Sequence, residues 1–246
     1  MSLVEKASAE CSHVIVSIFV NPLQFVQGED FDRYPRPFEK DLQFCRQAGV
    51  HAVFHPAASE MYPHGQAGLT RVIPPAALIH HLCGAFRPGH FEGVATVVAK
   101  LFGLVQPQRS YFGEKDYQQL VVIQRLVKDL DIPVTVVPAA TLREHDGLAM
   151  SSRNVYLTED QRKQAPAIYE TLQFVVEKTR SGELSLHEAL AAGKAKLASI
   201  PGCTVQYLEA CHPETLEPLA AAAGRMVVLA AAKLGNVRLI DNVIVR

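Results

Sequence analysis

Gly113, Lys115 and Asp116 lie close together where a short apolar stretch gives way to a helical pattern, in the segment 112–119 with the sequence FGEKDYQQ. In an open α/β sheet, ligands bind outside the carboxyl ends of the strands, which is where such a junction falls. A lysine holds a phosphate as a point charge, and the first N–H groups of a helix point toward an anion. The segment therefore indicates a phosphate or nucleotide site. An ordinary helix start with solvated charges is the alternative.

The hydroxyls of Ser151 and Ser152 stand beside Arg153 in the segment 150–154, MSSRN. The guanidinium of an arginine is a rigid fork of donors that suits phosphate oxygens. This composition is typical of a mobile loop that binds a polyanion. Taken alone, the segment also fits a surface loop that joins two domains.

Two other segments carry polar groups at predicted turns. Residues 21–25, NPLQF, directly follow the first predicted strand, so we expect Asn21 and Gln24 to face the ligand crevice of the sheet. Amide side chains both donate and accept hydrogen bonds, which suits the binding of a hydroxy acid. Residues 87–91, RPGHF, precede an apolar helical pattern. By themselves, both segments also fit ordinary turns.

The ten histidines form no metal-binding pattern. His80 and His81 are adjacent, and neighbours on a helix point in different directions. His13, His51 and His55 lie in or near predicted strands, where packing or surface roles suffice. We therefore expect no metal site built from histidine.

The composition of the 246 residues is that of an ordinary globular protein, with one large domain or two small ones. Lys and Arg number 24 against 25 Asp and Glu, so no basic excess indicates a nucleic-acid partner. Five cysteines without a Cys-x-x-Cys pair argue against disulfides and favour the reducing cytosol. The first residues do not resemble a signal peptide, and no apolar run approaches the roughly 20 residues that span a bilayer. We expect a cytoplasmic protein that binds neither membrane nor nucleic acid.

Short apolar runs alternate with helical patterns through the first 140 residues or so. Strands are expected at 14–20, 50–55, 110–113 and 134–137, and helices at 37–48, 93–105 and 117–130. The first strand is a β-branched run that we expect to be buried. Strands that alternate with helices predict βαβ units, an α/β fold class and a parallel sheet.

The pattern changes after about residue 142. Thr158 with Gln161, and Ser185 with Glu188, fit capping boxes at the starts of two helices, 159–180 and 186–199. Three strands are expected at 204–209, 226–232 and 237–245, with a hairpin at residues 235–236. Helices followed by antiparallel strands predict a smaller α+β domain, so that the domains are 1–142 and 143–246.

Seven segments together resemble one family, pantothenate synthetase, which is also called pantoate–β-alanine ligase. They are VSIFVNPLQF at 16–25, YPR at 34–36, EMYP at 60–63, RPGHFEGV at 87–94, FGEKDYQQL at 112–120, DGLAMSSRN at 146–154 and LIDN at 239–242. They occur in family order and at family-like intervals across nearly the whole chain. The resemblance implies the nucleotidyltransferase superfamily, with a Rossmann-like N-terminal domain that binds nucleotide and pantoate and a smaller C-terminal domain.

The resemblance also implies a reaction and its partners. The family condenses pantoate with β-alanine, using ATP and Mg²⁺, through a pantoyl adenylate, and releases pyrophosphate and then AMP. Its members are cytoplasmic homodimers in coenzyme A biosynthesis. Such chemistry needs cations and N–H donors that stabilise charge on phosphate oxygens, and it needs no protein nucleophile.

Roles carry over by position. The resemblance assigns Gln24 and Gln119 to pantoate and β-alanine, with Asn21 nearby. It assigns the ATP site to a larger set, namely Gly113, Glu114, Lys115, Asp116, Leu142, Met150, Ser151, Ser152 and Arg153. Of these, Lys115, Ser151, Ser152 and Arg153 are the expected catalytic residues, with Lys115 on the phosphates. Met150 to Arg153 correspond to the flexible phosphate loop, and Leu142 is expected to line the nucleotide site through its backbone.

One family motif is missing. Family members begin with a strand followed by a segment that ends in His-x-Gly-His, and both histidines contact the ATP phosphates. In this chain Ser2, Leu3 and Val4 align just after the second histidine. We therefore expect an N-terminal truncation relative to the family, and a gap or unpaired edge in the sheet. Because the loss of one fixed donor to an oxyanion costs about 10²–10³ in rate, we expect weak or no ligase activity.

Several interpretations of this departure stay open. The start of the chain is misassigned, the chain is an impaired short form, or another chain or segment supplies the missing strand. Two functional alternatives also stand, a non-catalytic protein that binds pantoate or nucleotide and another adenylyltransferase of the superfamily. The pair Gln24 and Gln119 argues against the second alternative, because it matches the pantoate pattern.

Overall fold

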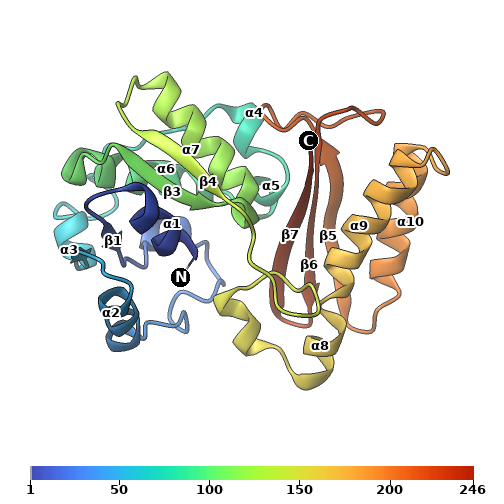
Figure 1. Ribbon diagram of the computed structural model, residues 1–246, viewed down its shortest axis with the longest axis horizontal. Helices are drawn as coiled ribbons and strands as arrows, with labels where there is room; N and C mark the ends of the chain where they lie inside the picture. The colour runs from blue at the N-terminus through green and yellow to red at the C-terminus, as the bar shows by residue number, and fades with distance from the viewer. Residues whose placement is uncertain (1) are drawn as a thin grey trace. The chain divides into compact units, whose positions relative to one another are not determined.

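The computed structural model describes residues 2–246, and Figure 1 shows its helices and strands. The chain divides into two compact units. The first unit comprises the described residues up to 114 together with 122–139, and the second comprises 115–121 together with 140–246. Parallel strands with helices in the first unit confirm the α/β class expected from the sequence. The domain boundary expected at 142 stays a proposal.

The strands of the first unit are parallel, as predicted, but they form two separate pairs. β1 (Ile15–Ser17) pairs with β2 (Ala52–Phe54), and β3 (Arg109–Gly113) pairs with β4 (Thr135–Ala139). Within residues 2–246, no ladder joins the two pairs into one sheet. The four strands therefore make two two-stranded sheets within the first unit.

The prediction of a long, buried first strand is wrong. The strand expected at 14–20 shortens to β1, and Ile15 is 48% exposed. Because β1 pairs only with β2 in the described chain, its other edge has no neighbouring strand. The β-branched pattern indicates a strand correctly, but burial depends on what packs beside that strand.

Three predicted helices of the first part of the chain are confirmed. They are α2 (Phe38–Gln47), α6 (His90–Val105) and α7 (Tyr117–Asp129), and α6 begins three residues earlier than expected. Val94 and Phe102 of α6 share an apolar core with Ile123 and Leu126 of α7 and with Val134. No helix within residues 2–246 is long and apolar enough to cross a membrane.

Within residues 2–246, four α-helices of the first unit were not predicted. They are α1 (Ser2–Glu10), α3 (Ala58–Met61), α4 (Ala76–Ile79) and α5 (Cys83–Phe86). The last three span four residues each, too short to show a helical period. Tertiary contacts hold α1, because Lys6 Nζ donates to the carbonyl of Pro138 at 2.8 Å. At its other end, Glu10 accepts from Arg109 and from the Tyr111 hydroxyl, both at 3.0 Å.

The second unit follows the predicted order of helices and then antiparallel strands. Its sheet runs β5 (Cys203–Cys211), β6 (Met226–Leu234) and β7 (Val237–Val245), and a two-residue turn at Gly235 joins the last two. The helices are α8 (Glu159–Gln164), α9 (Ala167–Arg180) and α10 (Leu186–Ala198). In Figure 1, α9 and α10 pack against this sheet. Both predicted capping boxes are present, at Thr158 and Ser185.

The single helix expected at 159–180 is wrong, because the structure contains two helices there. α8 ends at Gln164, and Pro166 is the residue before α9. A proline has no N–H to donate and its ring clashes with the preceding turn, so it starts a helix more readily than it continues one. The proline was visible in the sequence, and it marks the break.

The core of the second unit lies between α9, α10 and the sheet. Leu172 and Val175 of α9, Leu197 of α10, Leu208 of β5 and Val228 of β6 are all fully buried. Each is apolar, and the strands alternate their side chains toward this layer. The core therefore fixes the sheet whose last strand, β7, carries polar residues described below.

Replacement of Leu172 by alanine should lower the free energy of unfolding by about 2–5 kcal/mol, because it removes a buried side chain and leaves a cavity. Urea unfolding followed by far-ultraviolet circular dichroism measures this loss. Gln173→Ala, one residue along on the exposed side of α9, is the matched control and should change the same quantity by less than about 0.5 kcal/mol. Equal effects of the two substitutions would contradict this packing.

Candidate functional site

Asn21 uses its whole side chain to shape the turn that carries Gln24. Its Nδ2 donates to the carbonyl of Gly93 at 3.1 Å and to Gln24 Oε1 at 3.2 Å. Its Oδ1 accepts from the Leu23 N–H at 3.2 Å and from the Tyr62 hydroxyl at 2.7 Å. Two donors and two lone pairs are thus satisfied, and Asn21 is only 2% exposed. Asn21 caps the short helix η1 (Pro22–Gln24) from inside the first unit.

This arrangement orients the carboxamide of Gln24. Its Oε1 points to Asn21, so its Nε2 is directed away from that partner. In the part of the chain that the structure describes, Nε2 donates to no protein group. Gln24 therefore offers a fixed hydrogen-bond donor, which suits a carboxylate or hydroxyl oxygen of a ligand.

The backbone of Gln24 is held from the start of α6. Its carbonyl accepts from His90 Nδ1 at 2.7 Å and from Arg87 Nη2 at 3.3 Å. Arg87 Nη1 also lies 2.9 Å from His90 Nε2, and an arginine can only donate. His90 therefore accepts at Nε2 and donates at Nδ1, which is the neutral form of the ring. Arg87 in turn forms an ion pair with Glu29, at 2.5 and 2.7 Å.

Gly93 lets α6 approach this turn closely. A Cβ built at Gly93 would collide with the backbone carbonyl of Leu23 and lie 2.8 Å from the N atom of Gln24. The absence of a side chain therefore permits the bond from Asn21 to the Gly93 carbonyl. Gly93 lies in the segment 87–94 that resembles the family, but no sequence pattern predicted its contact with Asn21, 72 residues earlier.

A cavity of about 520 Å³ opens beside the same turn. Its lining consists of Leu23, Phe25, Val26, Gln27, Arg71, Phe86, Pro88 and Gly89. Gln24 is not among these residues, although both of its chain neighbours, Leu23 and Phe25, are. We do not assign it to the ligand of Gln24.

The segment around Lys115 folds as the sequence indicates. β3 ends at Gly113, the short helix η2 (Glu114–Asp116) follows, and α7 begins at Tyr117. The Lys115 side chain is 19% exposed, and its Nζ lies 3.7 Å from Asp116 Oδ2. Within α7, Gln118 is buried and Gln119 is half-buried. Gly113 and Glu114 belong to the first unit, while Lys115, Asp116 and Gln119 belong to the second.

Residues 142–150 form a tight hairpin in the second unit. Met150 N donates to the Leu142 carbonyl at 2.9 Å, and Arg143 and Ala149 form an antiparallel bridge. The side chains of Leu142 and Met150 are exposed. The hairpin leads directly into the short helix η3 (Ser152–Tyr156). The segment expected to bind phosphate therefore begins at the end of this hairpin.

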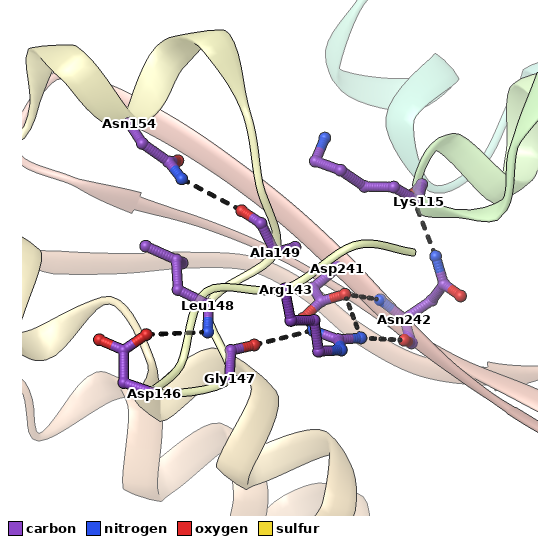
Figure 2. A network of polar contacts seen from close by, with 9 residues as sticks. All are labelled: Lys115, Arg143, Asp146, Gly147, Leu148, Ala149, Asn154, Asp241 and Asn242. Carbon is purple, nitrogen blue, oxygen red and sulfur yellow. Dashed lines mark hydrogen bonds and ion pairs between the residues drawn. The ribbon is translucent and has the colours of Figure 1, made fainter. Parts of the chain in front are cut away.

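The side chains of the phosphate segment lie at the start of η3. Ser151 caps η3, with its Oγ accepting from the Arg153 N–H at 3.3 Å. Asn154 Nδ2 donates back to the Ala149 carbonyl at 3.1 Å, as Figure 2 shows. Ser152 is exposed and Arg153 half-buried. The turn is therefore bonded to the hairpin that precedes it.

A polar network on β7 was not predicted as functional (Figure 2). Arg143 Nη1 and Nη2 donate to the two carboxylate oxygens of Asp241, at 2.6 and 3.0 Å. Burial raises the pKa of Asp241 above its usual value, against the opposing effect of Arg143. The Arg143 guanidinium also stacks on the Tyr169 ring, 3.6 Å from its centroid. Asn242 Nδ2 donates to the Lys115 carbonyl at 3.0 Å.

The segment LIDN at 239–242 resembles the family, but no role was predicted for its residues. The signal was an Asp and an Asn side by side within an apolar strand pattern. Polar residues in such positions need partners when they are buried. The structure supplies those partners from residues 115 and 143, far away in sequence.

The structure thus assembles two sets of predicted residues, one in each unit. Asn21 and Gln24 share one turn of the first unit. The second unit connects Lys115, through β7, with the hairpin that carries Leu142, Met150 and the turn from Ser151 to Arg153. Each set is held by contacts within its own unit.

Mg²⁺ does not fit a preformed carboxylate site in the described part of the chain. No group of three or more His, Cys, Asp or Glu side chains within residues 2–246 is arranged to hold a metal ion. Mg²⁺ commonly binds through substrate phosphates and retains several waters.

Comparison with known proteins identifies the family. The sequence model of the family described as pantoate-beta-alanine ligase matches residues 1–244. A pantothenate synthetase from Thermus thermophilus is 52% identical over 244 residues, which cover 98% of this chain and 87% of that protein. The chain belongs to the pantoate-β-alanine ligase family. The family resemblance seen in the sequence is confirmed.

Some relatives of this family are longer. A bifunctional pantoate ligase/cytidylate kinase from Synechococcus elongatus is 50% identical over 241 residues, covering 98% of this chain. The match covers 46% of that protein, so the chain spans about half the length of this bifunctional relative. The region shared with it is the one that the family's sequence model matches.

Solved structures agree with this assignment. The crystal structure of the pantothenate synthetase from Thermus thermophilus has a TM-score of 0.95 at 51% identity, and the match covers 99% of this chain and 87% of that one. A pantoate-β-alanine ligase from Francisella tularensis, complexed with β-γ ATP and β-alanine, has a TM-score of 0.79 at 35% identity. That match covers 99% of this chain and 83% of the other.

Gly93→Ala should weaken the binding of pantoate by roughly tenfold or more, because the new Cβ displaces the turn that carries Gln24. Calorimetric titration with pantoate measures the dissociation constant. Gly103→Ala is the matched control, since Gly103 lies on the same helix and a Cβ there meets no atom within 4 Å. The control should bind as the unchanged protein does. Equal affinity in both variants would contradict the close approach described above.

The ion pair of Glu29 with Arg87 should weaken in acid, so that the protein becomes less stable there. Burial raises its pKa, but the hydrogen bond and charge of Arg87 outweigh this effect, so the pKa lies below the usual 4.5. The ion pair therefore stabilises the folded state above the usual pKa, and this stabilisation is lost as the pH falls through the lowered value.

The measurement is urea unfolding at a series of values between about pH 6 and pH 3. Glu29→Gln should be less stable near neutral pH and lose less stability over this interval, because its side chain does not titrate. Glu39→Gln, on the exposed surface of α2, controls for the change in net charge. Parallel pH profiles for the two variants would rule out the role given to the ion pair.

Proposed function

We propose that this chain condenses pantoate with β-alanine at the expense of ATP, through a pantoyl adenylate. The observation that carries the proposal is the fixed donor of Gln24, with Oε1 engaged by Asn21 and Nε2 directed outward. Pantoate is a hydroxy acid, so its carboxylate and hydroxyl oxygens accept from such a donor. Gln119 is the second proposed contact to pantoate, and Asn21 contributes by holding Gln24.

The proposed ATP site lies on the residues around Lys115 and the turn at 151–153. Lys115, Ser151, Ser152 and Arg153 bind the phosphates and stabilise charge on their oxygens during transfer. The remaining proposed contacts to ATP are Gly113, Glu114, Asp116, Leu142 and Met150. The ATP and β-alanine complex of the Francisella relative supports these two substrates. Mg²⁺, carried by the phosphates, would add positive charge at the same oxygens.

The proposed reaction has two balanced steps. An oxygen of the pantoate carboxylate attacks the α-phosphorus of ATP and pyrophosphate leaves, which forms the mixed anhydride pantoyl adenylate. The amine of β-alanine then attacks the acyl carbon, AMP leaves, and the amine loses a proton. The side chains named above bind and orient the reactants, so no covalent enzyme intermediate forms.

We further propose a cytoplasmic homodimer that acts in coenzyme A biosynthesis. All five cysteines are free thiols, which suits a reducing compartment. The homodimer rests on the family resemblance. The low activity expected from the missing His-x-Gly-His motif stays a prediction.

The test is AMP release by the purified chain with pantoate, β-alanine and ATP, together with calorimetric titration of pantoate. AMP release should require both pantoate and β-alanine. Gln24→Ala should raise the pantoate dissociation constant by about tenfold to a hundredfold, as expected for one lost bond to a charged group. Gln108→Ala, at an exposed position of the first unit, is the control and should bind pantoate normally.

Different outcomes separate the alternatives. AMP release that ignores pantoate would favour another adenylyltransferase. Pantoate binding without any adenylate, in a chain that binds ATP, would favour a non-catalytic derivative. Unchanged pantoate affinity in Gln24→Ala would overturn the role proposed for Gln24.

A further inference from the structure

Asn242 joins two segments of the proposed ATP site that are far apart in sequence. Its Nδ2 donates to the carbonyl of Lys115 at 3.0 Å, across 127 residues of chain. That carbonyl belongs to η2, directly before the first turn of α7. The bond therefore holds the backbone from which the Lys115 side chain extends (Figure 2).

Asp241 fixes the direction of Asn242. Its Oδ1 accepts from the backbone N–H of Asn242 at 2.8 Å, and Arg143 Nη2 donates to the Asn242 carbonyl at 3.3 Å. Both peptide groups of Asn242 are thus engaged in the network, in addition to its place on β7. Because hydrogen bonds hold both the N–H and the carbonyl of Asn242, its side chain has a fixed direction toward Lys115.

Arg143 connects the same network to the second phosphate-binding segment. Besides its ion pair with Asp241, Arg143 Nη1 donates to the Gly147 carbonyl at 3.0 Å. Its backbone forms the bridge with Ala149, one residue before Met150. The hairpin that leads into the turn at 151–153 is therefore fastened to the strand that also holds Lys115.

Stability alone does not explain this choice of side chains. Taking Asp241 and Arg143 out of water costs desolvation, and apolar residues of similar volume often stabilise a core equally well. An apolar pair could neither accept from the Asn242 N–H nor donate to the Gly147 carbonyl of the hairpin. What the polar network adds is direction and a fixed spacing between two cationic segments.

We propose that Asn242 and the ion pair of Arg143 with Asp241 are positioning residues for the triphosphate of ATP. They set the position of Lys115 relative to the turn that carries Arg153, without touching the nucleotide. The proposal rests on the ATP site of the proposed function. Preorganised cations bind a polyphosphate more tightly because less order must be imposed on binding.

The first experiment is a double-mutant cycle between Asn242 and Lys115, read out as the dissociation constant for ATP. Asn242→Ala alone should weaken ATP binding by about tenfold. In a Lys115→Ala background the same change should cost less than about twofold, because no side chain is left to position. Arg238→Ala is the matched control, since it removes a 2.6 Å bond from the same strand to Gln206. It should leave ATP affinity within about twofold.

The second experiment needs no ligand. Hydrogen exchange of the backbone amides in 115–121 and 142–150 should accelerate in Asn242→Ala and stay unchanged in Arg238→Ala. If Asn242→Ala fails to fold, Asn242→Asp takes its place, because it keeps the shape and loses the donor. Arg143→Lys should restore part of the ATP affinity lost in Arg143→Ala.

The outcomes are distinct. A lower unfolding temperature with unchanged ATP affinity would overturn the proposal, and so would equal losses from Asn242→Ala in both backgrounds. A chain that binds no ATP at all would refute the proposed ATP site. In that case, unchanged amide exchange in Asn242→Ala would also overturn the positioning role, whereas faster exchange would support it.

Discussion

The polar network of the second unit depends on one constraint, which is that the buried carboxylate of Asp241 needs partners. A carboxylate that is only 5% exposed needs a charged partner and several donors, or its burial would be prohibitive. Arg143 supplies the charge, and the Asn242 N–H supplies a further donor. Because these donors come from the hairpin and from the strand itself, satisfying one charge fixes the geometry of both.

The first unit solves a similar problem with a neutral group. Asn21 is buried and has each of its donors and lone pairs matched by a partner from η1, α6 or the segment at Tyr62. The result is again a direction imposed on a neighbouring side chain, here the carboxamide of Gln24. Both units therefore use buried polar networks to orient the groups that we propose as ligand contacts.

Local patterns predicted most of the elements, because caps, prolines and periodicity act over a few residues. The capping boxes at Thr158 and Ser185, the turn at Gly235 and the parallel pairing in the first unit are examples. Two predictions were wrong, namely that the first strand is buried and that a single helix spans 159–180. The first failed because burial depends on neighbouring elements, and the second because Pro166 was given too little weight.

The site, in turn, could be predicted as residue types but not as a network. Lys115, Gln24 and the segment 150–153 stand out by composition and family resemblance, whereas the partners that orient them, Tyr62 and Asn242 among them, are separated from them by long stretches of chain. No local pattern encodes such contacts.

The hydrogen bond between Asn242 and Lys115 also has a consequence for how the protein is made. It is a contact of very high sequence separation, and such contacts form late because a long loop must close first. During synthesis the helix that follows Lys115 emerges well before β7 exists. The turn at Lys115 therefore lacks this restraint until the 127 residues that separate it from Asn242 have been synthesised.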